Sequence, residues 1–118
     1  MPKKYKSDFE RRIARNLRSR KIKVVYEPFR IKFTKEVTYT PDWVLPNGII
    51  VESKGNFRPA DRSKHLLIKE QHPEYDIRFL FIRNNKITKK SKTRYSDWCE
   101  QYGFKYAFLK IPQEWIDE

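Results

Sequence analysis

Cysteine and long apolar runs are the two features that this sequence most nearly lacks. Cys99 is the single cysteine among 118 residues, so the chain cannot form an intramolecular disulfide, and a reducing cytosol suits it. No apolar stretch approaches the ~18 residues of a membrane-spanning helix, and no signal peptide is recognisable. These absences exclude insertion into a membrane and favour a cytoplasmic protein.

Internal repeats are absent as well, and the length limits the number of domains. A chain of 118 residues can bury one modest core but not two independent ones. We therefore expect residues 1–118 to form a single domain, with residues 1–6 as a basic N-terminal arm. Any larger machine must be an oligomer.

Acidic residues are scarce relative to basic ones. The chain has 27 Lys and Arg against 15 Asp and Glu, a formal net charge of +12 that is spread over the whole sequence. Solubility alone can explain such a charge, but the excess favours contact with a polyanion, and nucleic acid is the leading candidate. The aromatic residues mostly occupy core-like positions, so we assign them to packing and not to base stacking; examples are Phe79, Phe81, Trp98 and Trp115.

The N-terminal third predicts one helix and two short strands. Ser7 followed by Glu10 has the form of a capping box, which marks the start of a helix. The apolar residues that follow recur at helical spacing and predict its buried stripe: Phe9, Ile13 and Leu17. Residues 22–33 predict two strands broken at residues 27–28, and residues 34–38 form a connector.

The remaining two thirds alternate strands with helices. In chain order we expect a hairpin over residues 41–54, a helix over about 61–71, a central strand over 77–82, a lysine-rich loop over 83–93, a helix over 95–102 ended by Gly103, a strand over 105–109 and a terminal turn over 112–116. This order predicts an α/β fold in which helices flank a mixed β-sheet.

The predicted hairpin carries two carboxylates and an amine. Glu52 and Lys54 are two apart on a strand, so both side chains project from the same face. A loop of residues 46–48 would pair Asp42 with Glu52, whereas a tight turn of residues 47–48 would pair Asp42 with Ser53. Only the first register places both carboxylates on one face.

Such a trio suits metal-dependent cleavage of a phosphodiester. Hard cations such as Mg²⁺ are held by a few carboxylates together with water and substrate phosphate, so we expect Asp42 and Glu52 to be the metal ligands. Lys54 would place a positive charge beside them, to orient the attacking water or to stabilise the transition state. The structural alternative is a solvated strand face with a weak Glu–Lys pair, and we favour the catalytic interpretation.

Longer motifs around the trio resemble a known family. They are YTPDW at residues 39–43, LPNGI at 45–49, VESKG at 51–55, DR at 61–62, KHLLIKEQHPE at 64–74, WCE at 98–100, Gly103, IP at 111–112 and EWI at 114–116. Together they resemble bacteriophage endonuclease I, a Holliday-junction resolvase of the restriction-endonuclease-like nuclease superfamily. The resemblance covers nearly everything from the first helix onward.

The resemblance implies a structure-selective endodeoxyribonuclease that nicks four-way junctions and other branched DNA as a homodimer. It implies Mg²⁺ in each site, with Mn²⁺ as a substitute, and the cytoplasm of a bacterial host cell as the location. The family's catalytic residues fall on Glu10, Asp42, Glu52 and Lys54. It further implies a domain-swapped dimer with residues 34–38 as the swap connector, so that Glu10 of one chain completes the site of the other.

Two departures from the family bear on this expectation. The connector before Tyr39 is shorter here, and the family's basic C-terminal extension is missing after Glu118, which affects the exchange geometry and the DNA affinity. Glu10 also has a second interpretation as a capping-box residue. The basic residues that we expect to contact DNA are Lys3, Lys4, Arg11, Arg15 and Arg18.

Two other functions remain possible from the sequence. A non-catalytic nucleic-acid-binding module with a nuclease-like fold would need only the basic surface, but the acidic positions are all chemically intact, which argues against it. A nuclease acting on ordinary duplex ends or on specific sequences fits the charge pattern equally well, and only the family resemblance speaks against it.

Overall fold

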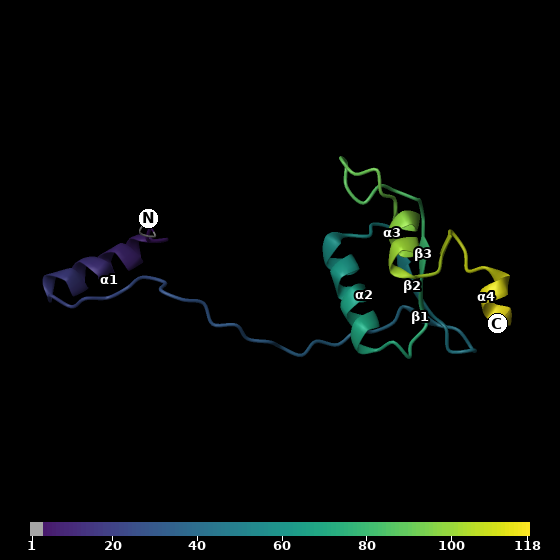
Figure 1. Ribbon diagram of the computed structural model, residues 1–118, viewed down its shortest axis with the longest axis horizontal. Helices are drawn as coiled ribbons and strands as arrows, with labels where there is room; N and C mark the ends of the chain where they lie inside the picture. The colour runs from purple at the N-terminus through teal and green to yellow at the C-terminus, as the bar shows by residue number, and fades with distance from the viewer. Residues whose placement is uncertain (1–3) are drawn as a thin grey trace. The chain divides into compact units, whose positions relative to one another are not determined.

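The computed structural model describes residues 4–118, and the chain divides into two units (Figure 1). The N-terminal unit extends to Val37, and the C-terminal unit comprises Thr38–Glu118. The prediction that the whole chain is a single nuclease domain stays a prediction. Within the described range, no helix combines the length and the apolar character needed to cross a membrane.

The N-terminal unit contains helix α1, Asp8–Ser19. The predicted cap is present, because the Ser7 Oγ accepts a hydrogen bond from the Glu10 amide at 3.1 Å. The Glu10 carboxylate reaches back to the amide of Lys6 at 2.7 Å, one residue before the position that a capping box requires. The hydroxyl of Tyr26 donates to the same carboxylate oxygen at 2.9 Å, which fastens the returning segment to the helix.

The two strands predicted over residues 22–33 are not formed. Among the described residues no strand pairs with this segment, and an isolated strand leaves its backbone groups without partners. The predicted buried stripe of α1 is also wrong for the single chain, because α1 has no buried residue and Phe9 is 69% exposed. Other large apolar side chains of this unit are exposed too: Val25, Phe29, Ile31, Phe33 and Val37.

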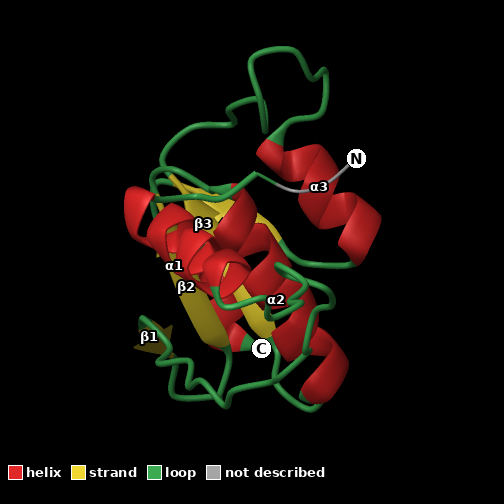
Figure 2. Ribbon diagram, turned by 90° about the vertical axis from the view of Figure 1, so that its left-hand side faces the viewer, coloured by secondary structure: helices red, strands yellow, loops and turns green. Residues whose placement is uncertain are grey.

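The C-terminal unit is built on a four-stranded mixed sheet in the order β1-β2-β3-β4. The strands are β1 Trp43–Val44, β2 Ile50–Lys54, β3 Ile77–Phe81 and β4 Tyr106–Phe108. β1 is antiparallel to β2, whereas β2, β3 and β4 are parallel, and Figure 2 shows β2 and β3 side by side. The helices are α2 Pro59–Gln71, α3 Tyr95–Tyr102 and α4 Gln113–Asp117. The predicted α/β class with a mixed sheet is therefore confirmed.

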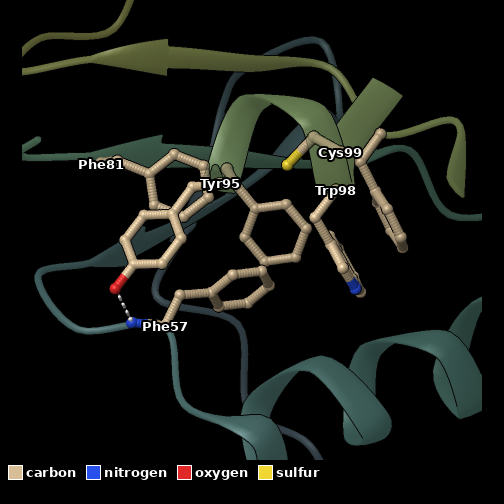
Figure 3. Packing of buried hydrophobic residues seen from close by; sticks show 7 residues of the cluster. Phe57, Phe81, Tyr95, Trp98 and Cys99 are labelled. Carbon is tan, nitrogen blue, oxygen red and sulfur yellow. Dashed lines mark hydrogen bonds between the residues drawn. The ribbon is translucent and has the colours of Figure 1, made fainter. Parts of the chain in front are cut away.

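Alternate residues of β3 supply two separate cores. Phe79 and Phe81 belong to an aromatic cluster that also contains Phe57 and residues of α3, among them the buried Cys99 (Figure 3). The intervening Leu80 packs against a smaller cluster around Val51 and Trp115, the latter from α4. The predicted central strand is thus covered on both faces, because side chains two apart in a strand share a face.

A buried arginine holds the C-terminal helix against this smaller cluster. Arg78 of β3 is 1% exposed, and its guanidinium bonds to the carboxylates of Asp76 and Glu118. These hydrogen bonds raise the pKa of Arg78, with Glu118 the stronger partner. The guanidinium also lies 5.3 Å from the ring centre of Trp115.

Candidate active site

The hairpin of β1 and β2 has the register that places both carboxylates on one face. Trp43 pairs with Val51 and Val44 pairs with Ile50, so position 42 lies opposite position 52. The loop comprises residues 46–48, closed by the Leu45 amide donating to the Ile49 carbonyl at 2.8 Å. Gly48 has φ 90°, which glycine adopts without a steric cost. The alternative with a tight turn of residues 47–48 is excluded.

Asp42 is fixed to the neighbouring strand through one of its carboxylate oxygens. Oδ2 accepts hydrogen bonds from the amide of Ser53 at 3.0 Å and from its hydroxyl at 3.1 Å. The other oxygen, Oδ1, accepts no hydrogen bond from any residue that the structure describes. The Asp42 amide itself donates to Oε1 of Glu52 at 3.4 Å, which links the two acidic residues directly.

Glu52 is a buried carboxylate that stays ionised. Its exposure is 3%, and Oε1 accepts a hydrogen bond of 2.7 Å from the hydroxyl of Tyr39. Burial alone would raise the pKa of Glu52, but His65, the Tyr39 hydroxyl and the Asp42 amide outweigh it and lower the pKa to about 2. Conversely, burial and the bond to Glu52 raise the pKa of Tyr39, so its phenol remains a donor.

Lys54 lies between two carboxylates. Its Nζ is 3.6 Å from Oε2 of Glu52 and 3.4 Å from Oδ1 of Asp61. Asp61 sits in the first turn of α2, where its other oxygen accepts the amide of Arg58 at 3.1 Å. The helix start therefore anchors the residue that holds Lys54, and the amine stays beside the pair of acidic residues.

His65 is the part of the site that the sequence interpretation missed. The sequence pattern assigns no role to His65, but its side chain is completely buried and Nε2 is 3.9 Å from Oε2 of Glu52. Leu67, two residues further along α2, is 51% exposed, so the buried face of this helix is the one that carries His65. One sequence signal could have placed His65 in the site. His65 follows Asp61 by four residues, and residues four apart lie on the same face of a helix.

The remaining predicted site residues lie in the N-terminal unit. Glu10 bonds to Lys6 and Tyr26 within that unit, and its part in catalysis stays a prediction. Arg11 pairs with Asp8 at 2.6 Å, while Arg15 and Arg18 are exposed, as is Lys4. Lys3 lies outside the described residues.

A second basic surface follows strand β3. The basic loop, residues 83–94, has six Lys and Arg and no acidic residue. Lys54 pairs with Phe81, the last residue of β3, so the basic loop begins at the end of the parallel strands that carries Lys54. Two contacts fix its shape. The backbones of Lys86 and Arg94 form an isolated antiparallel β-bridge, and the side chain of Ile87 packs against the aromatic cluster.

The donor set of Asp42 and Glu52 suits a hard divalent cation. In the described part of the chain, Oδ1 of Asp42 accepts no hydrogen bond, and Oε2 of Glu52 has contacts of 3.6 Å to Lys54 and 3.9 Å to His65. Among residues 4–118, no group of three or more His, Cys, Asp or Glu side chains could hold a metal ion. Two carboxylates completed by water and phosphate oxygens match the binding preference of Mg²⁺, which seldom uses a complete protein cage.

Comparison with known proteins gives a consistent result over the whole chain. The family model described as phage endonuclease I matches residues 1–118. The chain is 46% identical to Endonuclease I of Escherichia phage T7 over 118 residues, covering 97% of this chain and 79% of that protein. It is 43% identical to Endodeoxyribonuclease 1 of Enterobacteria phage T3, covering 97% of this chain and 78% of that protein. The chain belongs to the phage endonuclease I family.

Proposed function

We propose that this protein is a structure-selective endodeoxyribonuclease that resolves four-way junctions and other branched DNA by Mg²⁺-dependent hydrolysis, with Mn²⁺ as a substitute. The observation that carries the proposal is the cross-strand pair of Asp42 and Glu52 with Lys54 beside it, on a chain of net charge +12. Family membership supports DNA as the substrate, because the two relatives are named as an endonuclease and an endodeoxyribonuclease.

Each residue of the site has a separate task in this proposal. Asp42 and Glu52 would hold Mg²⁺ through their carboxylates, and the bound ion would supply Lewis-acid chemistry for activating water and relieving charge on the phosphoryl oxygens. Lys54, held between Glu52 and Asp61, directs its ammonium toward the phosphate and stabilises the charge that grows there. The buried position of Glu52 keeps competing water away from one side of the site.

The protein acts as a homodimer that exchanges its N-terminal units, with residues 34–38 as the connector, and each C-terminal unit has a restriction-endonuclease-like core. The exposed apolar side chains of the N-terminal unit support exchange, because Phe29, Ile31 and Phe33 are 73%, 78% and 86% exposed in the single chain. A partner subunit that covers them would also bring Glu10 to the other subunit's acidic pair. Two sites per dimer match the two nicks that resolution of a junction requires.

Phosphate contacts come from two basic surfaces. One comprises Lys3, Lys4 and the arginines of α1, and the other is the basic loop next to Lys54. Such contacts supply affinity without reading sequence, which suits an enzyme that selects DNA by its branched shape.

One assay tests the proposed function. End-labelled four-way junctions and linear duplexes of matched sequence are incubated with the protein and Mg²⁺, and each strand is resolved on a denaturing gel. We expect paired nicks on opposing strands at the branch point, none in EDTA and little cleavage of the duplex. Binding of both substrates without any cleavage would instead identify a non-catalytic binding module, and equal cleavage of both would contradict selectivity for branched DNA.

A further inference from the structure

His65 poses a problem that packing alone does not explain. Its exposure is 0%, and neither ring nitrogen has a hydrogen-bond partner among the described residues. A buried polar group left unpaired is destabilising, so phenylalanine would serve better if the position only filled space. The ring is already surrounded by aromatic neighbours, at centroid distances of 5.1 Å to Tyr39 and 4.9 Å to Phe79.

Within residues 4–118, the acidic group beside His65 is the carboxylate of Glu52. Nε2 lies 3.9 Å from Oε2, which is an ion-pair distance but longer than a hydrogen bond. A shift of roughly 1 Å by either side chain would give the imidazole a charge-assisted hydrogen bond and remove its unpaired state. The Glu52 carboxylate, which would bind the metal, is thus also the group that could accept a hydrogen bond from the unpaired His65.

Tyr39 holds the same carboxylate from another direction. Its hydroxyl donates to Oε1 at 2.7 Å, and Tyr39 is the second residue of the C-terminal unit, directly after the connector. The ring of Tyr39 packs edge-on against that of His65. The Nζ of Lys64 lies 5.5 Å from the centre of the Tyr39 ring. Tyr39 and His65 therefore form one packed unit around Glu52.

From this geometry we infer that Tyr39 and His65 are positioning residues, which hold the Glu52 carboxylate from two sides and set the direction in which Oε2 meets the metal. This inference rests on the proposed metal-dependent nuclease. Supporting partners around a ligand fix its orientation, and their loss typically weakens metal affinity by about 10- to 100-fold. Neither residue is assigned as a metal ligand or as a DNA contact.

Two variants remove the polar atoms and keep the rings. Tyr39→Phe deletes only the hydroxyl, and His65→Phe keeps a planar ring between Tyr39 and Phe79. The chain offers a matched control for each. The hydroxyl of Tyr106 donates to Glu100 at the same 2.7 Å, and Nδ1 of His72 lies 3.2 Å from Glu74, both away from the acidic pair. Tyr106→Phe and His72→Phe therefore remove the same chemistry elsewhere.

The first measurement is Mn²⁺ affinity of the DNA-free protein, followed by electron paramagnetic resonance or calorimetry. We expect Tyr39→Phe and His65→Phe each to weaken Mn²⁺ binding about 10-fold or more, and both controls to bind like the unmodified protein. The second measurement is cleavage of a four-way junction as Mg²⁺ is varied. The Mg²⁺ requirement of the two variants should rise, while KM for the junction stays unchanged.

Thermal melting separates positioning from mere structural support. His65→Phe removes a buried unpaired group, so its Tm should equal or exceed that of the unmodified protein even as metal affinity falls. His65→Gln retains a donor and should recover part of the affinity. The double variant Tyr39→Phe/His65→Phe should lose less than the product of the two single effects, because both residues act through one carboxylate.

The outcomes distinguish this inference from the proposed function. If the unmodified protein binds no Mn²⁺ and cleaves no junction, the proposed nuclease fails. If the unmodified protein does both, and both variants match their controls in metal affinity, the positioning roles are wrong while the nuclease stands. A loss of Mn²⁺ affinity that merely follows a lowered Tm would also overturn the positioning roles. Tyr39→Phe leaves the aromatic ring in place, so it tests the roles independently of His65→Phe.

Discussion

Glu52 combines burial with a retained charge. Three neighbours oppose the effect of burial on its pKa, and two of them, Tyr39 and His65, come from outside the hairpin. The sequence predicted the hairpin and its two possible registers, since strand alternation and Asn47-Gly48 are local signals. It could not reveal that His65 would face Glu52, because that contact depends on how α2 docks onto the sheet.

Removal of either acidic charge should abolish cleavage. Asp42→Asn and Glu52→Gln each keep the shape of the side chain but weaken metal binding, so junction cleavage should fall to background. Junction binding measured by gel retardation in EDTA should remain largely intact, because the basic surfaces supply the affinity. Cleavage at the unmodified rate in either variant would contradict the assigned site.

Lys54→Ala should separate catalysis from metal binding. The amine is no metal ligand, so Mn²⁺ affinity measured by calorimetry should be unchanged or higher after its loss. Turnover of a saturating junction should fall by about 100- to 1000-fold, the usual cost of losing one charge-stabilising group. Lost Mn²⁺ affinity would show that Lys54 supports the ligands and does not act on the substrate.

At the scale of elements, sequence pattern succeeded where each element has its partners nearby. The strand over 77–82 and the helix over 95–102 were predicted within a residue of β3 and α3, because their apolar residues meet one another in the same unit. Residues 22–33 have an equally clear apolar pattern but no strand to pair with in the described chain. A pattern predicts which side chains need burial, and it does not say which molecule buries them.

The basic loop should bind DNA more strongly than its charge alone would explain. Changing Lys89, Lys90 and Lys92 together to Gln should weaken binding to both duplex and junction. The slope of log K against the logarithm of the salt concentration should become shallower by about 1 for each phosphate that is no longer neutralised. Lys90→Gln alone can be compared with Lys105→Gln, which removes the same charge from the residue before β4, at the opposite end of the parallel strands. Equal effects of the two single variants would mean that only net charge matters.

The attachment of α4 should depend on pH. Arg78 lowers the pKa of Glu118 below its ordinary value of 4.5. A carboxyl whose pKa is depressed on folding adds stability above its ordinary pKa and loses it as the pH falls toward the folded value. The Tm of the unmodified protein should therefore fall as the pH drops below about 4.5.

Two variants assign that fall to the pair of Arg78 and Glu118. Glu118→Gln should have a lower Tm at neutral pH and a weaker dependence on acid, as measured by thermal melts from about pH 7 to pH 3. Glu114→Gln, an exposed residue of the same helix, should behave like the unmodified protein. Identical pH profiles for both variants would show that Arg78 does not hold α4 in place.

At the scale of the whole molecule, the two units differ in how they can be stable. The C-terminal unit has its own cores, whereas α1 of the N-terminal unit has no buried residue. The large apolar side chains of residues 22–37 are exposed in the single chain, and the proposed exchange between two subunits would give them a surface to pack against. If that proposal holds, the stability of the N-terminal unit depends on protein concentration.

A mixing experiment decides whether the units are exchanged. Glu10→Ala protomers and Glu52→Gln protomers, each of which should be inactive alone, are combined under conditions that allow subunits to re-equilibrate. With exchange, one site of the heterodimer receives both changes and the other is intact, so nicking of a single strand should return. Continued inactivity despite verified heterodimers would show that each subunit supplies its own Glu10.

The strands of the sheet occupy the same order in space as in the sequence. During synthesis each strand can pair with the one made just before it, so this strand order allows the sheet to grow from the β1 edge as the chain leaves the ribosome. Asp42 and Glu52 are translated early, but the strand that flanks Glu52 and the helix that carries His65 arrive later. The order of translation thus imposes a delay between the synthesis of the acidic residues and the assembly of the site around them.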